Sequence, residues 1–268
     1  AYKLNILTGD VELHNQHWNL KIAKMSLQFA VNLSGRNVLG NPFELTGEIM
    51  TEKEVKEEIL QAENGVQLAW LYFLKCKMAV YLCDVTVATT AETLIKHLEK
   101  HNKHAAFYNL QAQAFHEGLL FCLLATACGE TNQRRRKHFV ARAEKRLKSI
   151  QPFVVTCPEN FRNKALLLQA EIESIKKEKS ISDISLLYHE AAAVSREEGF
   201  LHEQALALEK GGRFLLSDEH GSRSTFEARS FLVDAIKVYK EYGSRLKADQ
   251  LERLFGKELG SLSSITSC

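Results

Sequence analysis

The sequence predicts an all-α protein, a superhelix of antiparallel helix pairs. Three observations support this fold class. The 268 residues include only 14 Gly and 3 Pro, which suits long helices joined by short turns. Apolar residues recur at helical spacing along most of the chain. The only strand-like run, residues 153–156, is too short and too isolated to seed a sheet.

The first half of the chain shows clear helix signals. Asp10 can cap a long helix that ends at Ser34 and Gly35. Residues 51–54, Thr-Glu-Lys-Glu, have the spacing of a capping box and open a short acidic helix. The following helix, about 66–83, is apolar nearly all round, so we expect it at the centre of the packing. Further helices are expected at about 91–100 and 107–124.

The second half predicts more regular helices. A basic helix, about 132–150, is expected to end before Pro152, because proline disrupts a helix interior. Pro158 stands in the first turn of the next helix, where its missing N–H costs little. Gly199 and Gly243 can end two later helices as left-handed caps. The expected helices after Pro158 cover 158–179, 184–198, 200–216, 226–242 and 245–255.

Internal repetition supports an array of stacked helix pairs. A shift of 44 residues places Ala191 on Ala235 and Gly199 on Gly243. A helix pair of roughly 40 residues cannot bury its apolar face alone, so neighbouring pairs supply the core. The 34-residue tetratricopeptide pattern matches poorly, and we therefore predict degenerate, tetratricopeptide-like repeats. Residues 211–212, Gly-Gly, lie inside an expected helix and predict close helix packing.

We expect three regions along the chain. Residues 1–104 form an N-terminal helical segment continuous with the array, 105–255 form the tetratricopeptide-like repeats, and 256–268 form a flexible tail. If the stacking is interrupted, we expect the interruption in the loop 35–50. The chain begins without Met inside an expected helix and ends in a Ser-rich run. We therefore expect it to be a segment of a longer polypeptide.

Composition and charge limit the setting in which the chain works. Hydrophobic residues make up 45% and charged residues 25%, as in ordinary globular proteins. The net charge is only +2, so any basic patch must be local. No apolar run is long enough to span a bilayer, and no signal pattern opens the chain. We expect a cytoplasmic protein without membrane contact.

The cysteines predict thiols rather than disulfides. They are widely spaced, none forms a C-x-x-C pair, and four lie inside apolar helical runs. We expect them to be buried thiols. They are Cys76, Cys83, Cys122, Cys128, Cys157 and Cys268.

Motifs of catalysis and cofactor binding are missing from the sequence. No G-x-x-x-x-G-K-[ST] loop is present for a nucleotide, and no G-x-S-x-G for a serine hydrolase. The pairs His116-Glu117, His189-Glu190 and His202-Glu203 lack the nearby proline of phospho-accepting histidines. We expect these pairs to be solvated or part of helix interfaces, and we expect no cofactor.

Two histidine groups have helical spacing. His97, His101 and His104 stand at i, i+4 and i+7, and His14 and His17 at i and i+3. Imidazoles on one helix face can bind a metal, but a tetrahedral site needs a ligand from elsewhere. We favour a solvated helix end for both groups over a metal site.

The strongest local charge feature is the basic helix at about 132–150. It can be a solvated face, a surface for an acidic protein, or a contact for phosphate groups. Nucleic acid is the least favoured ligand, because the net charge is small and nucleic-acid binding usually brings more basic surface and more aromatic residues for base stacking. The candidate partner-binding face consists of Arg134, Arg135, Arg136, Lys137, Arg142, Lys145 and Arg146.

Several sequence blocks stand in a characteristic order. They are RRR at 134–136, CPENF at 157–161, KALLLQAE at 164–171, GF at 199–200, ALALE at 205–209, FLVDA at 231–235 and YGS at 242–244. In order and spacing, over about 105–255, they resemble the helical region of very large eukaryotic and bacterial signalling proteins. LTGDVE at 7–12 and LSG at 33–35 are similar to the same region more weakly.

The resemblance implies a context and a function. In that family a kinase-like domain and an AAA-type ATPase domain precede a tetratricopeptide-like region, and a GAF domain and often a two-component histidine kinase follow it. The chain departs from the family at Tyr242, where the family has Trp, and at residues 211–212, where alanines are commoner. The family's catalytic motifs lie outside the helical region, so no catalytic residue is implied here.

We therefore expect a non-catalytic helical scaffold of a larger signal-transduction ATPase or kinase. Its partners would be proteins, either neighbouring domains or a partner peptide, and not nucleic acid. The alternative is a free-standing tetratricopeptide-like adaptor that binds an acidic peptide or protein through the basic helix. An all-α enzyme is a third, less favoured interpretation.

Overall fold

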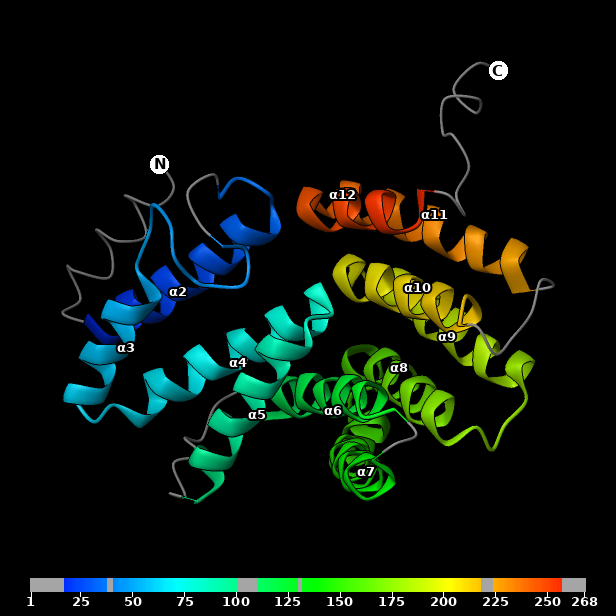
Figure 1. Cartoon of the computed structure of the whole chain (residues 1–268), viewed down its shortest axis with the longest axis horizontal. Coiled ribbons are helices and arrows are strands. Elements are labelled where there is room, and N and C mark those ends of the chain that lie inside the picture. The colour runs from blue at the N-terminus through cyan, green and yellow to red at the C-terminus, as the bar shows by residue number, and fades with distance from the viewer. Residues whose placement is uncertain (1–16, 38–40, 101–109, 130–131, 218–223, 257–268) are drawn as a thin grey trace, which may run out of the picture. The chain divides into compact units, whose positions relative to one another are not determined.

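The computed structural model describes residues 17–37, 41–100, 110–129, 132–217 and 224–256. These residues form eleven α-helices and no strand (Figure 1), so the all-α fold class is confirmed for them. None of the helices is long and apolar enough to cross a membrane. The chain divides into two compact units, residues 1–110 and 111–268. The expected boundary at 104/105 and the tail from 257 lie outside the described residues.

The first unit is built around one apolar helix. Its helices are α2 (His17–Leu33), α3 (Glu52–Gln61), α4 (Gly65–Leu82) and α5 (Val85–Lys100). Helix α4 packs against each of the other three, as its all-round apolar sequence predicts. The side chain of Asn64 caps α4 by accepting a hydrogen bond from the Gln67 amide at 3.1 Å.

The loop after α2 is held by buried amide side chains and is not a break in the packing. Asn32 Nδ2 donates to the carbonyl of Glu44 at 2.5 Å, and the Ile49 amide donates to Gln28 Oε1 at 3.1 Å. Lys75 of α4 donates to the carbonyl of Phe43 at 2.8 Å. Buried polar groups therefore tie the described part of this loop, where an interruption was expected, to α2 and α4.

The second unit stacks its helices in chain order. From α7 onward each helix packs against the next, and α8 also contacts α10. The connections are short, which makes consecutive helices antiparallel. The bounds are α6 Leu110–Ala127, α7 Gln133–Thr156, α8 Pro158–Lys176, α9 Ile181–Glu197, α10 Leu201–Leu215, α11 Ser224–Tyr242 and α12 Arg245–Leu254.

Helix α7 continues past the proline at which it was expected to end. Pro152 lies inside the helix, and the strand-like run 153–156 forms its last turn. A proline inside a helix costs about 3 kcal/mol. Packing offsets this cost, because Ile150 is buried and the Phe153 ring contacts that of Phe161 in α8, with centroids 5.5 Å apart.

Two helices 44 residues apart end in the same way. Gly199 after α9 has φ +77° and Gly243 after α11 has φ +89°, a left-handed conformation that glycine adopts without steric cost. The amide after each glycine bonds back to the helix, Phe200 to the Ser195 carbonyl at 2.7 Å and Ser244 to the Tyr239 carbonyl at 2.8 Å. The predicted caps are confirmed, and they are the structural counterpart of the 44-residue shift.

The predicted close packing at the paired glycines is confirmed. A Cβ added at Gly211 would lie 2.8 Å from the Phe231 ring, and one at Gly212 would lie 2.7 Å from Leu232 Cγ. Both neighbours belong to α11. The absence of two side chains thus lets α10 and α11 approach closely.

The cysteines are less buried than expected. Cys76 and Cys122 are buried inside helices, whereas Cys83, Cys128 and Cys157 are partly exposed. These three follow the last residue of α4, α6 and α7, and helix ends lie nearer the surface than helix middles. Cys268 lies outside the described residues.

Replacement of Gly212 by alanine should lower the stability of the second unit. The new Cβ would meet Leu232, and it would also lie 3.2 Å from the Ala228 carbonyl oxygen, which cannot move aside independently of α11. Overpacking costs about 1–3 kcal/mol and the helix propensity of alanine returns about 1 kcal/mol, so we expect a net loss of up to about 2 kcal/mol in urea unfolding. The control Ser230→Ala, at an exposed position of α11, should stay within about 0.5 kcal/mol. Equal stability of G212A and S230A would contradict the close packing.

Candidate interaction surface on helix α7

Helix α7 presents one side to the core and one to solvent. Asn132 caps it by accepting a hydrogen bond from the Arg135 amide at 3.2 Å. Phe139, Ala143 and Ile150 are buried, and the Phe139 ring stacks on that of Phe121 in α6, with centroids 6.4 Å apart. The spacing of four and seven residues places these anchors on one face, and this fixes the opposite face toward solvent.

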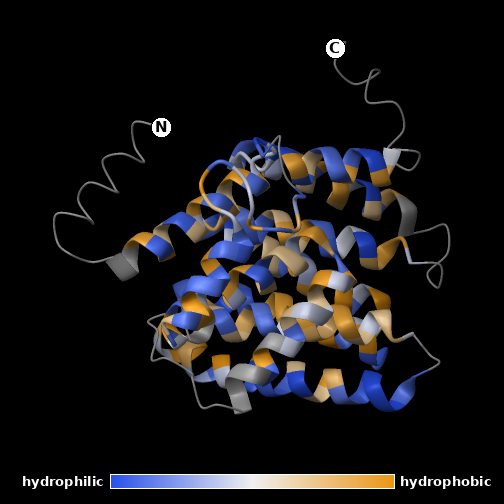
Figure 2. Ribbon diagram, turned by 60° about the vertical axis from the view of Figure 1, so that its left-hand side comes forward, coloured by the Kyte–Doolittle hydropathy of each residue, from blue (hydrophilic) through white to orange (hydrophobic). Residues whose placement is uncertain are grey.

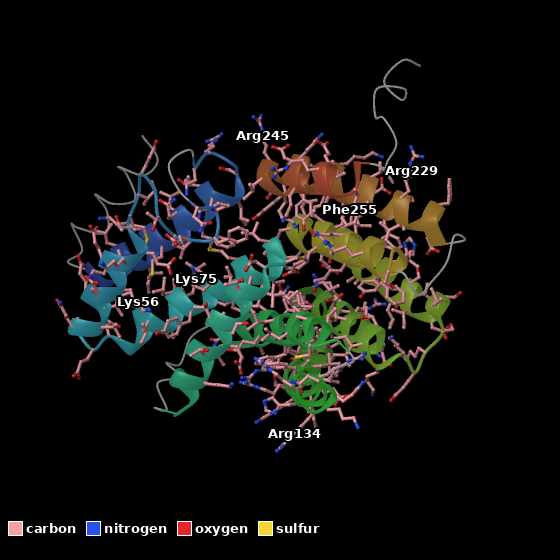
Figure 3. The ribbon with its side chains drawn as sticks, viewed as in Figure 1. Lys56, Lys75, Arg134, Arg229, Arg245 and Phe255 are labelled. Carbon is pink, nitrogen blue, oxygen red and sulfur yellow. The ribbon has the colours of Figure 1, made fainter. Side chains whose placement is uncertain are left out.

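Four of the seven predicted partner-binding residues lie on the solvent side. Arg134, Arg135, Lys137 and Lys145 are exposed, as is Lys148 further along. Arg134 extends from α7 away from the neighbouring helices in Figure 3. The hydrophilic end of α7, the lowest helix in Figure 2, is almost wholly blue.

The other three predicted residues bind within the protein. Arg136 Nη2 donates to the carbonyl of Ile175, at the end of α8, at 2.6 Å. The Arg142 guanidinium lies 4.1 Å from the centroid of the Phe121 ring. Arg146 forms an ion pair with Glu117 of α6, with 2.6 Å between Nε and Oε2. The seven side chains therefore do not share one exposed face, because only four of them point to solvent.

Sequence reasoning missed a set of buried ion pairs in the second unit. Lys164 of α8 pairs with Glu203 of α10 at 2.9 Å, and Glu171 of α8 pairs with Lys210 of α10 at 2.5 Å. Glu209 of α10 pairs with Lys247 of α12 at 2.8 Å. The sequence separations are 39, 39 and 38 residues. Opposite charges at this nearly constant separation, inside helices rich in apolar residues, were the signal that would have revealed the pairs.

Glu209 is the most enclosed of these carboxylates. Its side chain and that of Lys247 are both fully buried. Oε1 also accepts from Arg213 Nε at 2.9 Å, and Oε2 accepts from the Tyr239 hydroxyl at 2.8 Å. Burial alone would raise the pKa of Glu209, but the charges of Lys247 and Arg213 and the hydrogen bonds from Lys247 and Tyr239 outweigh it and lower this pKa from 4.5 to about 2.

A similar cluster surrounds Glu203. Oε2 accepts from Asn163 Nδ2 at 2.5 Å and from Lys164 Nζ at 2.9 Å, and Asn163 also donates to the Ser195 hydroxyl at 3.1 Å. Burial would raise the pKa of Glu203. Hydrogen bonds from His202 and Lys164 and the charges of both residues instead lower it from 4.5 to about 2.

The histidines take positions of different kinds. Nδ1 of the buried His116 lies 2.8 Å from the Ala112 carbonyl. His189 lies 3.5 Å from Glu227 and His202 lies 3.6 Å from Glu203, so all three predicted His-Glu pairs contribute to helix surfaces or interfaces. His14, His101 and His104 lie outside the described residues. Within the described ranges, no three His, Cys, Asp or Glu side chains are grouped to hold a metal ion.

The chain was compared with protein-family models, with curated proteins and with solved structures. None of the three comparisons finds a match.

Removing Arg146 should destabilise the protein far more than removing Arg134. Arg146→Ala leaves Glu117, whose side chain is 4% exposed, without its cation. We expect a loss of about 2–4 kcal/mol in denaturant unfolding. Arg134→Ala, at an exposed position of the same helix, should change stability by less than about 0.5 kcal/mol. Similar effects of the two variants would show that Arg146 does not have this structural role.

The stability of the second unit should fall as the pH drops from about 4.5 to about 2. The pKa of Glu209 is lower in the folded state, so its contribution is present above the unfolded value and is lost by protonation below it. At about 1.4 kcal/mol per pKa unit, the contribution is about 3 kcal/mol. Glu209→Gln should be less stable than the wild type at neutral pH and should lose less over this range. The control is Glu252→Gln, which removes a carboxylate that pairs with Lys240 and is more exposed than Glu209. It should keep the pH profile of the wild type. A wild-type pH profile in E209Q would contradict this role.

Proposed function

We propose that this chain is a non-catalytic helical scaffold and protein-interaction region of a larger cytoplasmic signal-transduction ATPase or kinase. The observation that carries the proposal is the in-order packing of α7 to α12, in which the Gly199 and Gly243 helix ends repeat. Stacked helix pairs of this kind, arranged as a tetratricopeptide-like superhelix, would fix the distance between the modules at their two ends. The resemblance of residues 105–255 to the helical region of multidomain signalling proteins supports the same role.

The buried ion pairs suit such a scaffold. They connect each helix of the set α8, α10 and α12 to the next one in that set. If one helix slid past another, charged groups would be left buried without partners, at a cost of several kcal/mol for each. The array would therefore keep its register under load, and nucleotide-dependent movement in an attached ATPase would be transmitted rather than absorbed.

The second candidate function is a free-standing adaptor for an acidic peptide or protein. The observation that favours it is the row of exposed cations on α7, of which Arg134, Lys137 and Lys145 are members. Carboxylates of a partner would bind these side chains by charge-assisted hydrogen bonds. In this role the stacked helices would serve as the support for one binding surface.

The mass and the terminal peptides of the native polypeptide distinguish the two functions. We expect mass spectrometry of the endogenous protein to find a much longer chain, with a phosphate-binding loop upstream of Ala1 and a GAF or kinase module downstream of Cys268. Scattering profiles of that longer protein should then differ with and without ATP, because the scaffold couples the modules. A polypeptide that begins near Ala1 and ends near Cys268 would overturn the scaffold and make the adaptor the leading function.

A further inference from the structure

Two segments far apart in sequence bring cations to the same end of the α7–α8 helix pair. The hydrogen bond from Arg136 to the Ile175 carbonyl, at 2.6 Å, ties the start of α7 to the end of α8. The connection that follows α8 carries Lys177 and Lys179, and both are exposed. Together with the exposed cations of the first turns of α7, they form a surface that we call the basic end. It consists of Arg134, Arg135, Lys137, Lys177 and Lys179.

Three of the five cations of the basic end, those of α7, have no carboxylate partner in the described part of the chain. Glu144 and Glu178 both pair with Lys176, at 3.3 and 3.2 Å, so they neutralise a residue outside the set. Glu173 reaches Lys179 at 3.9 Å, a long and partly exposed pair. In the described part of the chain, no carboxylate pairs with Arg134, Arg135 or Lys137. Three neighbouring cations therefore face solvent with no counter-charge from any described residue.

The placement of these cations is unfavourable for the helix itself. The first turn of α7 contains no acidic residue, and the positive end of the helix dipole repels cations placed there. Sites at which a sequence breaks such a local rule are those where function is expected to compensate for it. An anionic partner would reverse the sign of this interaction.

We propose that the basic end is the docking surface for an acidic segment of a protein, with side chains from α7 and from the α8–α9 connection binding the same segment. The proposal rests on the protein-interaction role argued above and names its partner. The guanidinium groups of Arg134 and Arg135 suit carboxylates, which they can bind through two parallel hydrogen bonds. Nucleic acid fits less well. Phe139, the aromatic residue nearest in sequence on α7, is buried and offers bases no ring on which to stack.

Anisotropy titrations of the full chain with a fluorescein-labelled oligo-glutamate peptide test the proposal. One variant reverses the α7 charges (R134E, R135E, K137E) and another those of the connection (K177E, K179E). The matched control, K148E with R245E, reverses one exposed charge about 16 Å further along α7, at 1.5 Å per residue, and one at the start of α12, on the opposite side of the second unit from Arg134 in Figure 3. Because all of these residues are exposed, melting curves should confirm that every variant folds.

Each variant of the basic end should weaken binding about tenfold or more, equivalent to about 1.4 kcal/mol. At about 0.1 M salt the control should weaken binding less than about threefold, because charges beyond about 10 Å are then screened. The proposal would be overturned by no binding of the peptide at this salt concentration, by wild-type affinity in K177E/K179E, or by equal losses in the control. Tighter binding of a single-stranded RNA of equal charge would overturn it in favour of nucleic acid. None of these results depends on the length of the native polypeptide. The scaffold proposal, which that length tests, can therefore be wrong while the docking proposal holds, and the reverse.

Discussion

Burial of opposite charges between next-but-one helices is the constraint on which the second unit depends. Lys247 and Glu209 have no exposed surface, and neither could remain charged in that position without the other. Apolar contacts between helices tolerate small sliding movements, since one methyl group replaces another. An ion pair with two further hydrogen bonds does not tolerate such sliding, because the movement would separate the charges. The apolar core supplies most of the driving force for folding, and the ion pairs select one alignment of α8, α10 and α12.

The first unit uses a related device around its long loop. Lys75, buried on α4, donates both to the Phe43 carbonyl and to Glu52 at the start of α3, the latter at 3.0 Å. Glu52 in turn accepts from the Leu45 amide at 2.7 Å. One lysine thus joins a loop, the beginning of a helix and the central helix. In both units a buried charged side chain, paired inside the protein, holds other segments in place: the loop in the first unit and the helices α8, α10 and α12 in the second.

Local signals in the sequence were sufficient for most of the fold. Glycines and apolar periodicity predicted the helices, the glycine caps and the central position of α4, whereas the capping box expected at residues 51–54 forms no side-chain cap bond from Thr51. They failed where tertiary contacts decided the outcome: Pro152 is accommodated because Phe153 packs on Phe161. The candidate surface was predicted only in part for the same reason. Charge identifies Arg136 and Arg146 as surface cations, but only the positions of Ile175 and Glu117 show that both side chains turn inward.

The contact between the paired glycines of α10 and helix α11 also constrains how this protein can change during evolution. Gly212 faces Leu232, and Gly211 faces both Phe231 and Cβ of Tyr188, so each small residue is matched to a large one across the interface. A larger residue on α10 becomes acceptable only if its counterpart on α11 shrinks, and the intermediate with one change is penalised. The facing positions of α10 and α11 would therefore vary in pairs, while exposed positions such as Ser230 remain free to vary singly.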